Sequence, residues 1–385
     1  MISRDAVLRV LEGYDREKVK VGVLASHSAL DVCDGGVEEG FRTLALCQAG
    51  RDEPYARYFR ALRDENGTLL KGVVDEAVVL KSFKEAVTER VQERLRSDNV
   101  LFVPNRSFVS YVGLEAVEDT FLIPMVGSRN LLRTEERTEE RGYYWILEKA
   151  GLPFPRIFRT PGEIDSLAIV KLPHKVKRLE RGFFTAASQE EYEEKSQRLL
   201  RQGVITPEDL EEARVEKYIL GPVFNFDFFY SPLEGMGERL ELLGIDWRFE
   251  TSLDGHVRLP AGQQLTLLGE ERDPEYVVCG HNSATLRESL LSKVFPLAER
   301  YVQATQEHFP PGMIGPFTLQ TCVDKDLNFY IYDVSPRIGG GTNVHMSIGH
   351  PYGNSLWRSR MSTGRRVALE IRRALETDSL ERIVT

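Results

Sequence analysis

The sequence predicts an α/β protein that begins with a doubly wound, Rossmann-like domain. Residues 19–25 form an apolar, β-branched run typical of a buried strand, and a short polar turn leads from it into a helix expected over residues 28–39. A second apolar run, residues 100–103, ends in the same kind of polar turn. Ligands of such sheets bind beyond the carboxyl ends of the strands, so we expect both turns to face one crevice.

The chain has 385 residues, which is enough for two or three domains. Its net charge of −9 argues against a protein that binds nucleic acid by neutralising phosphates. The charged helix expected over residues 1–20 has no apolar signal region, and no stretch is apolar for the length of a membrane span. The four cysteines lack zinc-site spacing, and we expect them to be reduced thiols of a cytoplasmic protein: Cys33, Cys47, Cys279 and Cys322.

Polar residues follow the two buried strands of the first domain. His27 lies just after the first strand, where the N-terminus of the next helix presents free N–H groups. It could hydrogen-bond a phosphorylated substrate, or it could cap the helix. Ser107 follows the second strand and could cap a helix expected over residues 108–114. Its neighbour Arg106 could meet a phosphate or carboxylate, although a solvated surface arginine is the simpler expectation.

The rest of the chain is expected to form two further units, so the predicted domains are residues 1–126, 127–221 and 222–385. In the second unit, an apolar strand expected over residues 167–172 contains Lys171. A lysine on a buried strand needs a counter-charge, whereas a lysine at a sheet edge extends its amine to solvent. Both alternatives are open from the sequence.

The remaining elements follow from shorter patterns. The alternation over residues 223–230 places Asn225 and Asp227 on one face of a strand and aromatic side chains on the other. Further strands are expected over residues 41–47, 76–80, 182–187, 215–220 and 240–250, and further helices over 83–97, 134–149, 189–201, 284–308 and 362–375.

The most informative pattern is a predicted hairpin near the C-terminal end, with strands over residues 317–323 and 328–334. Gln320 lies on the first strand and Asp333 near the end of the second, and each is a polar residue in an apolar run. Burying such residues without a partner costs free energy. One oxygen ligand from each of two neighbouring strands suits Mg²⁺, which completes its octahedron with waters and phosphate oxygens.

Two features directly after the hairpin extend this interpretation. Arg337 follows Asp333 by four residues and could neutralise a transferring phosphoryl group. The glycine run over residues 339–341 frees backbone N–H groups to surround an anion. On spacing alone, an ordinary hairpin with Asp333 capping a turn is an equally good interpretation.

The same stretch resembles the C-terminal part of ATP-grasp ligases in residues 313–317, in Gln320, in the run from Asp333 to Arg337 and in residues 340–343. More narrowly, nearly the whole chain resembles the archaeal formate-dependent 5-formaminoimidazole-4-carboxamide ribonucleotide synthetases, the PurP family. The resemblance implies an ATP-grasp fold with a Rossmann-like N-terminal domain. It also implies a ligase that uses ATP and Mg²⁺ or Mn²⁺ to join formate to 5-aminoimidazole-4-carboxamide ribonucleotide, in a homo-oligomer without nucleic-acid or membrane partners.

Roles for individual residues come with the resemblance. Lys171 and Arg337 would be catalytic, and Gln320 and Asp333 would bind the metal. The nucleotide would be bound by Lys171, Arg181, Glu216 and Glu250. The purine precursor would be bound by His27, Ser107, His281, Gly340, Thr342 and Asn343.

Three of the departures from the family bear on the substrate or the activity. Residues 174–182 are rich in cations where the family has a glycine-rich segment over the triphosphate, part of the predicted loop 173–182. Trp145 stands where ATP-grasp proteins often have a phosphate-binding lysine, and His281 stands where the family usually has asparagine. Two alternatives follow, a ligase for a different acid and amine, and a non-catalytic nucleotide-binding paralogue.

Overall fold

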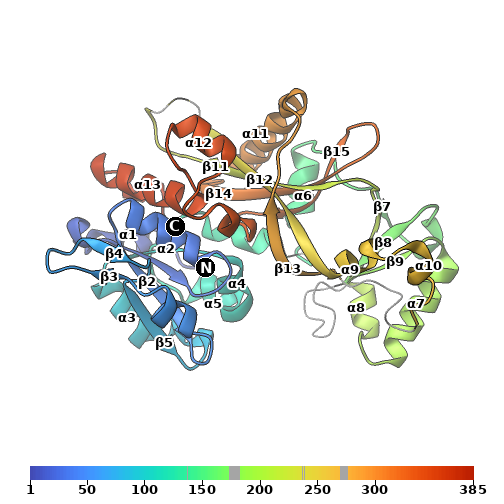
Figure 1. Cartoon of the computed structure of the whole chain (residues 1–385), viewed down its shortest axis with the longest axis horizontal. Coiled ribbons are helices and arrows are strands. Elements are labelled where there is room, and N and C mark those ends of the chain that lie inside the picture. The colour runs from blue at the N-terminus through green and yellow to red at the C-terminus, as the bar shows by residue number, and fades with distance from the viewer. Residues whose placement is uncertain (137, 173–182, 236, 238, 269–275) are drawn as a thin grey trace.

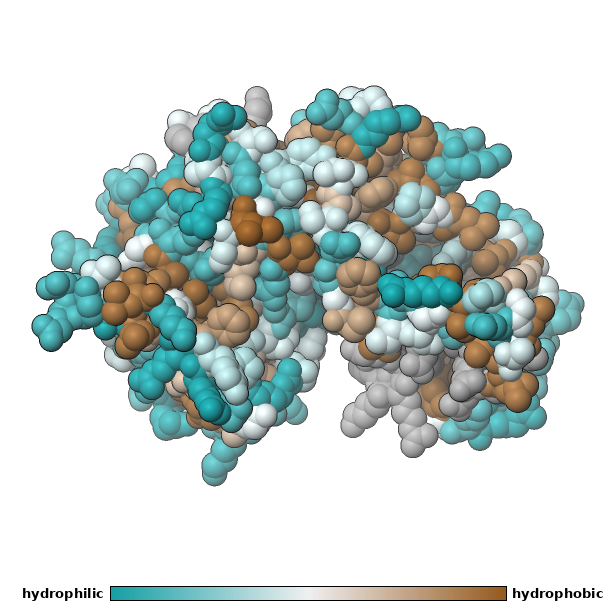
Figure 2. Space-filling model, viewed as in Figure 1, coloured by the Kyte–Doolittle hydropathy of each residue, from teal (hydrophilic) through white to brown (hydrophobic). Residues whose placement is uncertain are grey.

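The computed structural model describes residues 1–385 except residues 137, 173–182, 236, 238 and 269–275. Three main sheets organise these residues, together with a small hairpin of β3 (Leu62–Arg63) and β4 (Leu69–Lys71). Figure 1 shows the N-terminal sheet and the second sheet at opposite ends of the molecule, with the third sheet between them. In Figure 2 the surface is notched between these two ends, beneath the third sheet.

The N-terminal sheet is parallel, in the order β5-β2-β1-β6, which confirms the predicted doubly wound domain. Its strands are β1 (Lys20–Leu24), β2 (Arg42–Gln48), β5 (Glu76–Leu80) and β6 (Val100–Val103). Separate apolar clusters cover its two faces, one built with α1 and α2 and the other with α3, α4 and α5. These helices are α1 (Arg4–Glu12), α2 (Ala29–Glu38), α3 (Glu89–Ser97), α4 (Arg106–Val112) and α5 (Leu114–Asp119).

The second sheet is antiparallel and has the order β7-β10-β8-β9. Its small core contains Phe158, Ala168, Val170 and Val215. The strands are β7 (Ile157–Phe158), β8 (Ala168–Lys171), β9 (Phe183–Ala186) and β10 (Arg214–Lys217), and the helices beside them are α7 (Gln189–Arg201) and α8 (Pro207–Glu211).

The third sheet is antiparallel, in the order β13-β12-β11-β14-β15. Its strands are β11 (Val223–Tyr230), β12 (Leu240–Ser252), β13 (Tyr276–Ser283), β14 (Gly315–Val323) and β15 (Phe329–Ser335). Alternate residues such as Phe226, Phe228, Phe317 and Leu319 pack against α6 (Tyr143–Lys149) and α11 (Leu291–His308). The opposite face of the sheet is therefore left for the polar members of the alternation.

The C-terminal segments return to the first domain. Helix α13 (Thr363–Glu376) packs along α2, and its Val367, Ile371 and Ala374 share one apolar cluster with Val21 and Val23 of β1. Two elements precede α13, the 3₁₀ helix η8 (Gly341–His345) and α12 (Pro351–Trp357). Two short helices follow β12, namely α9 (Leu253–Arg258) and α10 (Ala261–Gln264). The first domain is therefore packed with help from the end of the third segment, and the three predicted domain boundaries stay a proposal.

Three predicted elements differ in the structure. The helix expected over residues 83–97 is divided at Thr88, whose extended backbone separates a 3₁₀ turn (Phe83–Val87) from α3. The helix expected from residue 284 begins only at Leu291, because β13 continues to Ser283 along β12. The helix expected over 134–149 is a 3₁₀ segment, η4 (Arg129–Glu135), followed by α6. None of the helices in the described part of the chain combines the length and apolarity that a membrane crossing needs.

Candidate active site

A row of polar side chains crosses all five strands of the third sheet. Asn225 of β11 lies opposite Asp246 of β12 on one side and opposite Gln320 of β14 on the other. The row continues at one end to Ser283 of β13 and at the other to Asp333 of β15. Residues directly opposite one another share a face of a sheet, so these five side chains point away from the aromatic core. The spacing predicted Gln320 and Asp333 as neighbours, and the structure brings them together; Asp333 lies within its strand and does not cap a turn.

The glycine-rich loop after β15 lies close to this row. A Cβ atom at Gly341 would lie 2.2 Å from the Asp246 carboxylate, so only glycine fits there. A Cβ atom at Gly340 would lie 2.9 Å from Nε2 of His27 and 3.3 Å from Nε2 of His281. Asn343 Nδ2 donates a hydrogen bond of 2.8 Å to the backbone oxygen of His27. The loop therefore brings the first domain and the third sheet together at two histidines.

Two turns at strand ends of the first domain contain two of the predicted substrate residues, His27 and Ser107. His27 has a left-handed backbone (φ 57°), and its Nδ1 lies 3.0 Å from Ser28 Oγ, so His27 does not cap α2. Asn105 Nδ2 donates to the backbone oxygens of Leu24 and Ser26, which ties the β6 turn to the β1 turn. Asn105 also caps α4, so the alternative in which Ser107 caps that helix is wrong; Ser107 is buried in the first turn. In the glycine-rich loop, Thr342 Oγ1 donates to the Gly339 backbone oxygen at 3.3 Å.

Three arginines converge on these groups. Burial lowers the pKa of His27 well below its ordinary value, and the charges of Arg337, His281, Arg106 and Arg248 lower it further. The imidazole is therefore neutral near pH 7, and the cations around it make the site attractive to anions. Arg106, expected as a solvated surface arginine, is only 22% exposed and forms an ion pair of 3.1 Å with Glu136, so that expectation is wrong.

Each arginine has an acidic or polar partner. Arg337 Nε donates to Glu135 Oε2 at 3.2 Å, and both side chains are buried. Burial, the largest cause, lowers the pKa of Arg337 despite this partner. Arg248 donates to Gln320 Oε1. Burial opposes the raised pKa of Arg106, to which the charges of Glu135 and Glu136 contribute most and that of Asp333 less. Burial also opposes the raised pKa of Arg248, to which Tyr332 and then Asp333 contribute. Asp333 is therefore close to both cations.

Gln320 and Asp333 supply oxygens of the kind that a hard divalent cation binds, and a cation at Gln320 Oε1 would replace the hydrogen bond from Arg248. The residues lie directly opposite each other, and Gln320 Nε2 donates to Ser335 Oγ at 3.3 Å, which orients the amide. In the described part of the chain, no group of three or more His, Cys, Asp or Glu side chains is arranged to hold a metal ion. A cation here would need further oxygens from water or a phosphorylated ligand, which is how Mg²⁺ is commonly bound.

Lys171 lies at the junction of the second and third sheets. It is buried and forms an ion pair of 2.7 Å with Glu216 on the neighbouring strand β10. Its Nζ also donates to Tyr144 Oη at 2.8 Å and to the backbone oxygen of Tyr332, next to Asp333, at 3.0 Å. The counter-charge that burial demands is thus Glu216, and the alternative of a solvent-exposed edge lysine is wrong. The Glu216 carboxylate also accepts a bond from Tyr144. The contact of Glu216 with an adenine or ribose stays a prediction.

The other predicted positions lie as follows. Glu250 is on β12, two residues beyond Arg248, and its charge contributes to the raised pKa of Arg248. Trp145 packs against Arg141 and His308 at the end of α11, and not in the polar row. Arg181 and the cationic loop 174–182 lie outside the described residues.

Sequence reasoning did not assign roles to Glu135, Tyr144, Asp227, Asp246 or Arg248. For two of them a signal existed, because Asp246, Arg248 and Glu250 alternate along one predicted strand, as charges facing a buried site would. Glu135 belongs to a run of acidic and basic residues that reads as a solvated surface.

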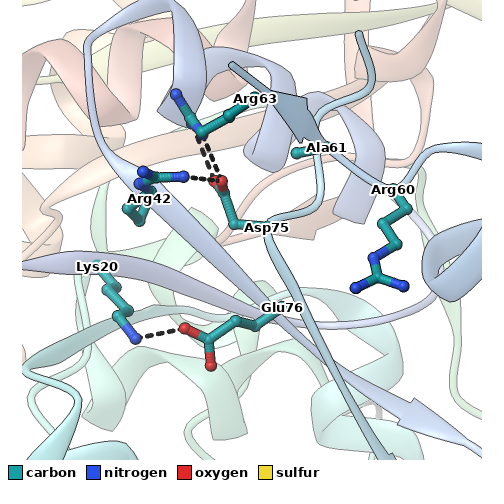
Figure 3. Close-up of a pocket in the computed structure, with 7 residues that line it drawn as sticks. All are labelled: Lys20, Arg42, Arg60, Ala61, Arg63, Asp75 and Glu76. Atoms are coloured by element: carbon teal, nitrogen blue, oxygen red, sulfur yellow. Dashed lines mark hydrogen bonds and ion pairs between the residues drawn. The ribbon is translucent and has the colours of Figure 1, made fainter. Parts of the chain in front are cut away.

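A pocket of about 370 Å³ lies elsewhere, where β1, β2 and β5 begin. Figure 3 shows Lys20 directed at Glu76, and Arg42 and Arg63 both directed at Asp75. Lys20, Arg42 and Arg63 are thus each paired with an acidic residue of the pocket, and Arg60 adds a further positive charge to its lining. The pocket also lies at the opposite ends of the strands from His27, so we do not count it in the candidate site.

Two family models match the chain. Residues 21–158 match a protein of unknown function, DUF1246, and residues 191–385 match a domain of unknown function, DUF1297. Among curated proteins, the chain is 42% identical over all of its length to a protein of Methanopyrus kandleri named 5-formaminoimidazole-4-carboxamide-1-(beta)-D-ribofuranosyl 5'-monophosphate synthetase. Proteins of the same name from Methanothermobacter thermautotrophicus and Methanocaldococcus jannaschii are 41% and 37% identical over 385 residues, and 99% and 100% of those proteins are covered.

Solved structures agree with the fold. The IMP biosynthesis protein PurP from Thermococcus kodakaraensis aligns with a TM-score of 0.69 and 30% identity, over 95% of this chain and 100% of that one. An ADP complex of N5-carboxyaminoimidazole ribonucleotide synthetase aligns with a TM-score of 0.57 and 11% identity, over 90% of this chain and 78% of that one. These likenesses confirm the predicted ATP-grasp fold with a Rossmann-like N-terminal domain.

Proposed function

The chain belongs to the family of 5-formaminoimidazole-4-carboxamide ribonucleotide synthetases, and we propose that it ligates formate to the amine of 5-aminoimidazole-4-carboxamide ribonucleotide. ATP is converted to ADP and phosphate in this reaction, and the formamido ribonucleotide is the product. The enzyme is thus an ATP-dependent carbon–nitrogen ligase of IMP biosynthesis. We include a cytoplasmic location and a homo-oligomeric assembly in the proposal.

The chemistry explains why the site gathers cations. Formate is a poor acyl donor because its negative charge repels nucleophiles and oxide is a poor leaving group. Transfer of the γ-phosphoryl group of ATP to formate gives formyl phosphate, which the amine then attacks while phosphate leaves. Arg337 and Lys171 would neutralise the transferring phosphoryl group, because preformed cations stabilise charge that is spread over phosphoryl oxygens in the transition state.

The remaining residues would bind and orient the reactants. His27, Ser107, His281 and the glycine-rich loop with Thr342 and Asn343 would bind the ribonucleotide, where the first domain meets the third sheet. Glu216, Glu250 and Arg181 would bind ATP. Gln320 and Asp333 would hold Mg²⁺ or Mn²⁺, which when bound supplies positive charge to the phosphate oxygens.

One observation carries the proposal: the polar row of the third sheet lies against the two histidines and the glycine-rich loop, with three arginines around them. The test is ADP release with ATP, formate and the carboxamide ribonucleotide, each omitted in turn, together with mass spectrometry of the product. We expect ADP and the formamido ribonucleotide in equal amounts only when all three are present. Absence of the formylated product would contradict the proposal.

A second candidate is a related ligase for another acid and amine, because His281 lies beside the loop at a position where the resemblance places asparagine. ADP release only with another acid–amine pair would favour it. Tight nucleotide binding without turnover would favour the non-catalytic paralogue.

A further inference from the structure

His281 belongs to a hydrogen-bonded chain of buried groups. Its Nδ1 lies 2.7 Å from Oδ1 of Asp246, whose side chain is 1% exposed. Asn225 Nδ2 donates to the same oxygen at 2.8 Å. Because Asp246 is held as an acceptor, His281 carries its proton on Nδ1, and Nε2 is left with a lone pair.

A second carboxyl group, that of Asp227, lies beside Asp246. Burial, and then the charge of Asp246, raise the pKa of Asp227 well above its ordinary value. Thr318 Oγ1 donates to Asp227 Oδ1 at 2.9 Å and fixes that group. Asp246 Oδ1 thus lies between the amide of Asn225 and the imidazole of His281.

The free nitrogen of His281 is aimed at the glycine-rich loop. His281 Nε2 and His27 Nε2 both lie within 3.3 Å of the place where Gly340 would carry a Cβ atom. The His281 side chain is 16% exposed, so a ligand can reach it. The glycine-rich loop, the two histidines and the cationic groups around them thus meet at one point of the candidate site.

The charges around His27 differ from those around His281, and this difference affects how readily each ring accepts a proton. His27 faces Arg337, Arg106 and Arg248, and these charges oppose formation of a second cation on its ring. His281 has Asp246 at hydrogen-bond distance, and a carboxylate stabilises an imidazolium. The charge distribution therefore favours His281 for accepting a proton during a reaction.

We propose that His281, positioned by Asp246, accepts the proton of the amine that attacks the acyl phosphate; this rests on the proposed function. The amine nitrogen forms a bond to the formyl carbon, and the bond from that carbon to the phosphate oxygen breaks, so phosphate leaves with the electron pair. The N–H proton passes to Nε2 of His281 and is then released to phosphate or solvent. Formation of formyl phosphate from ATP and formate needs no such acceptor.

The test separates the two half-reactions in His281→Gln and His281→Ala. Acyl phosphate formation is followed without amine, by positional isotope exchange in ATP labelled with ¹⁸O at the β,γ-bridge, in the presence of formate. Amine transfer is followed by release of the formamido ribonucleotide. We expect the transfer kcat to fall by about 10²-fold or more, the usual contribution of a positioned proton acceptor, while isotope exchange stays within about threefold of wild type. Asp246→Asn should likewise lower the transfer kcat and leave isotope exchange near the wild-type rate. His308→Gln, at the end of α11, is the matched control.

A second measurement tests proton transfer itself. Imidazole added to His281→Ala should restore part of the transfer rate and leave isotope exchange unchanged, which a purely structural role would not produce. Full transfer activity in His281→Gln, or an equal loss of both half-reactions in a variant that unfolds at the wild-type temperature, would overturn the role of His281. Failure of the proposed function is a different result, in which wild-type enzyme exchanges the label or releases ADP but forms no formamido product.

Discussion

Arg337 and Glu135 form a buried ion pair between residues that are 202 positions apart in the sequence. Glu135 also accepts a bond of 3.3 Å from Ser335 Oγ. The 3₁₀ segment that ends at Glu135 thus orients the end of β15, and with it the arginine beside the proposed metal position. A buried guanidinium with a two-oxygen partner has one geometry, which a lysine amine does not reproduce.

Replacing Arg337 by lysine is therefore expected to lower kcat by about tenfold or more, although the charge is kept, because the amine makes no paired bonds with Glu135. Steady-state kinetics with saturating ATP and formate measures this. Arg300→Lys on α11 is the control and should retain wild-type turnover. A wild-type kcat in Arg337→Lys would mean that the orientation of the guanidinium is not used.

Replacing Asp333 by alanine is expected to abolish turnover and leave the fold intact, because Asp333 is a proposed metal ligand near the surface of the site and not part of the core. Activity at several Mg²⁺ and Mn²⁺ concentrations, together with thermal unfolding, checks both parts. Asp326→Ala, in the exposed hairpin turn, is the matched control. Near wild-type activity in Asp333→Ala would refute the metal assignment.

Replacing Lys171 by methionine is expected to destabilise the protein by about 3–5 kcal/mol, because Glu216 is left as a buried charge without its cation. The double variant Lys171→Met with Glu216→Gln should recover a large part of this loss. Urea unfolding of the wild type, both single variants and the double variant gives the coupling free energy. Single variants as stable as wild type would show that the ion pair is open to water in solution.

Asp31 is expected to make stability depend on pH. Burial raises its pKa from 3.8 to about 7, although hydrogen bonds from Ser362, Gly364 and Thr342 oppose the shift. When the pH lies between these two pKa values, Asp31 keeps a proton in the folded protein that the unfolded chain has lost. The contribution of Asp31 to the free energy of unfolding therefore falls as pH rises from about 4 to 7. An asparagine side chain does not ionise. Asp31→Asn should therefore be more stable than wild type at pH 8, by up to about 4 kcal/mol, and should have nearly the wild-type stability at pH 4. Urea unfolding at both values measures the difference; equal pH profiles would contradict the prediction.

The sequence was most informative where a residue conflicts with its local surroundings. Gln320 and Asp333 are polar residues in apolar strands, and Lys171 is a charge in an apolar strand, so each implied a partner that the structure contains. Glu135 could not be found in this way, because it lies among other charged residues and only the distant Arg337 gives it a buried role.

The fold, too, could be predicted where local patterns decide the structure, and not where pairing with a distant strand decides it. The parallel strands of the first sheet are continuous apolar runs, and their positions agree with the prediction within a residue or two. Strand β13 has the sequence YVVCGHNS, in which glycine and polar residues hide the alternation, and its pairing with β12 decides its conformation. The pairing of His281 with Asp246 could not be found from the sequence, because the two residues lie 35 positions apart.

Helix α13 packs along α2, which itself lies on the N-terminal sheet, and this has a consequence for how the protein is made. Residues up to 126 leave the ribosome about 250 residues before α13 is complete. At about 5–20 residues per second, the side of α2 that α13 covers stays exposed for roughly 10–50 s in each round of translation. We therefore expect the yield of this protein to be more sensitive to the supply of chaperones than that of a protein whose first domain closes on itself.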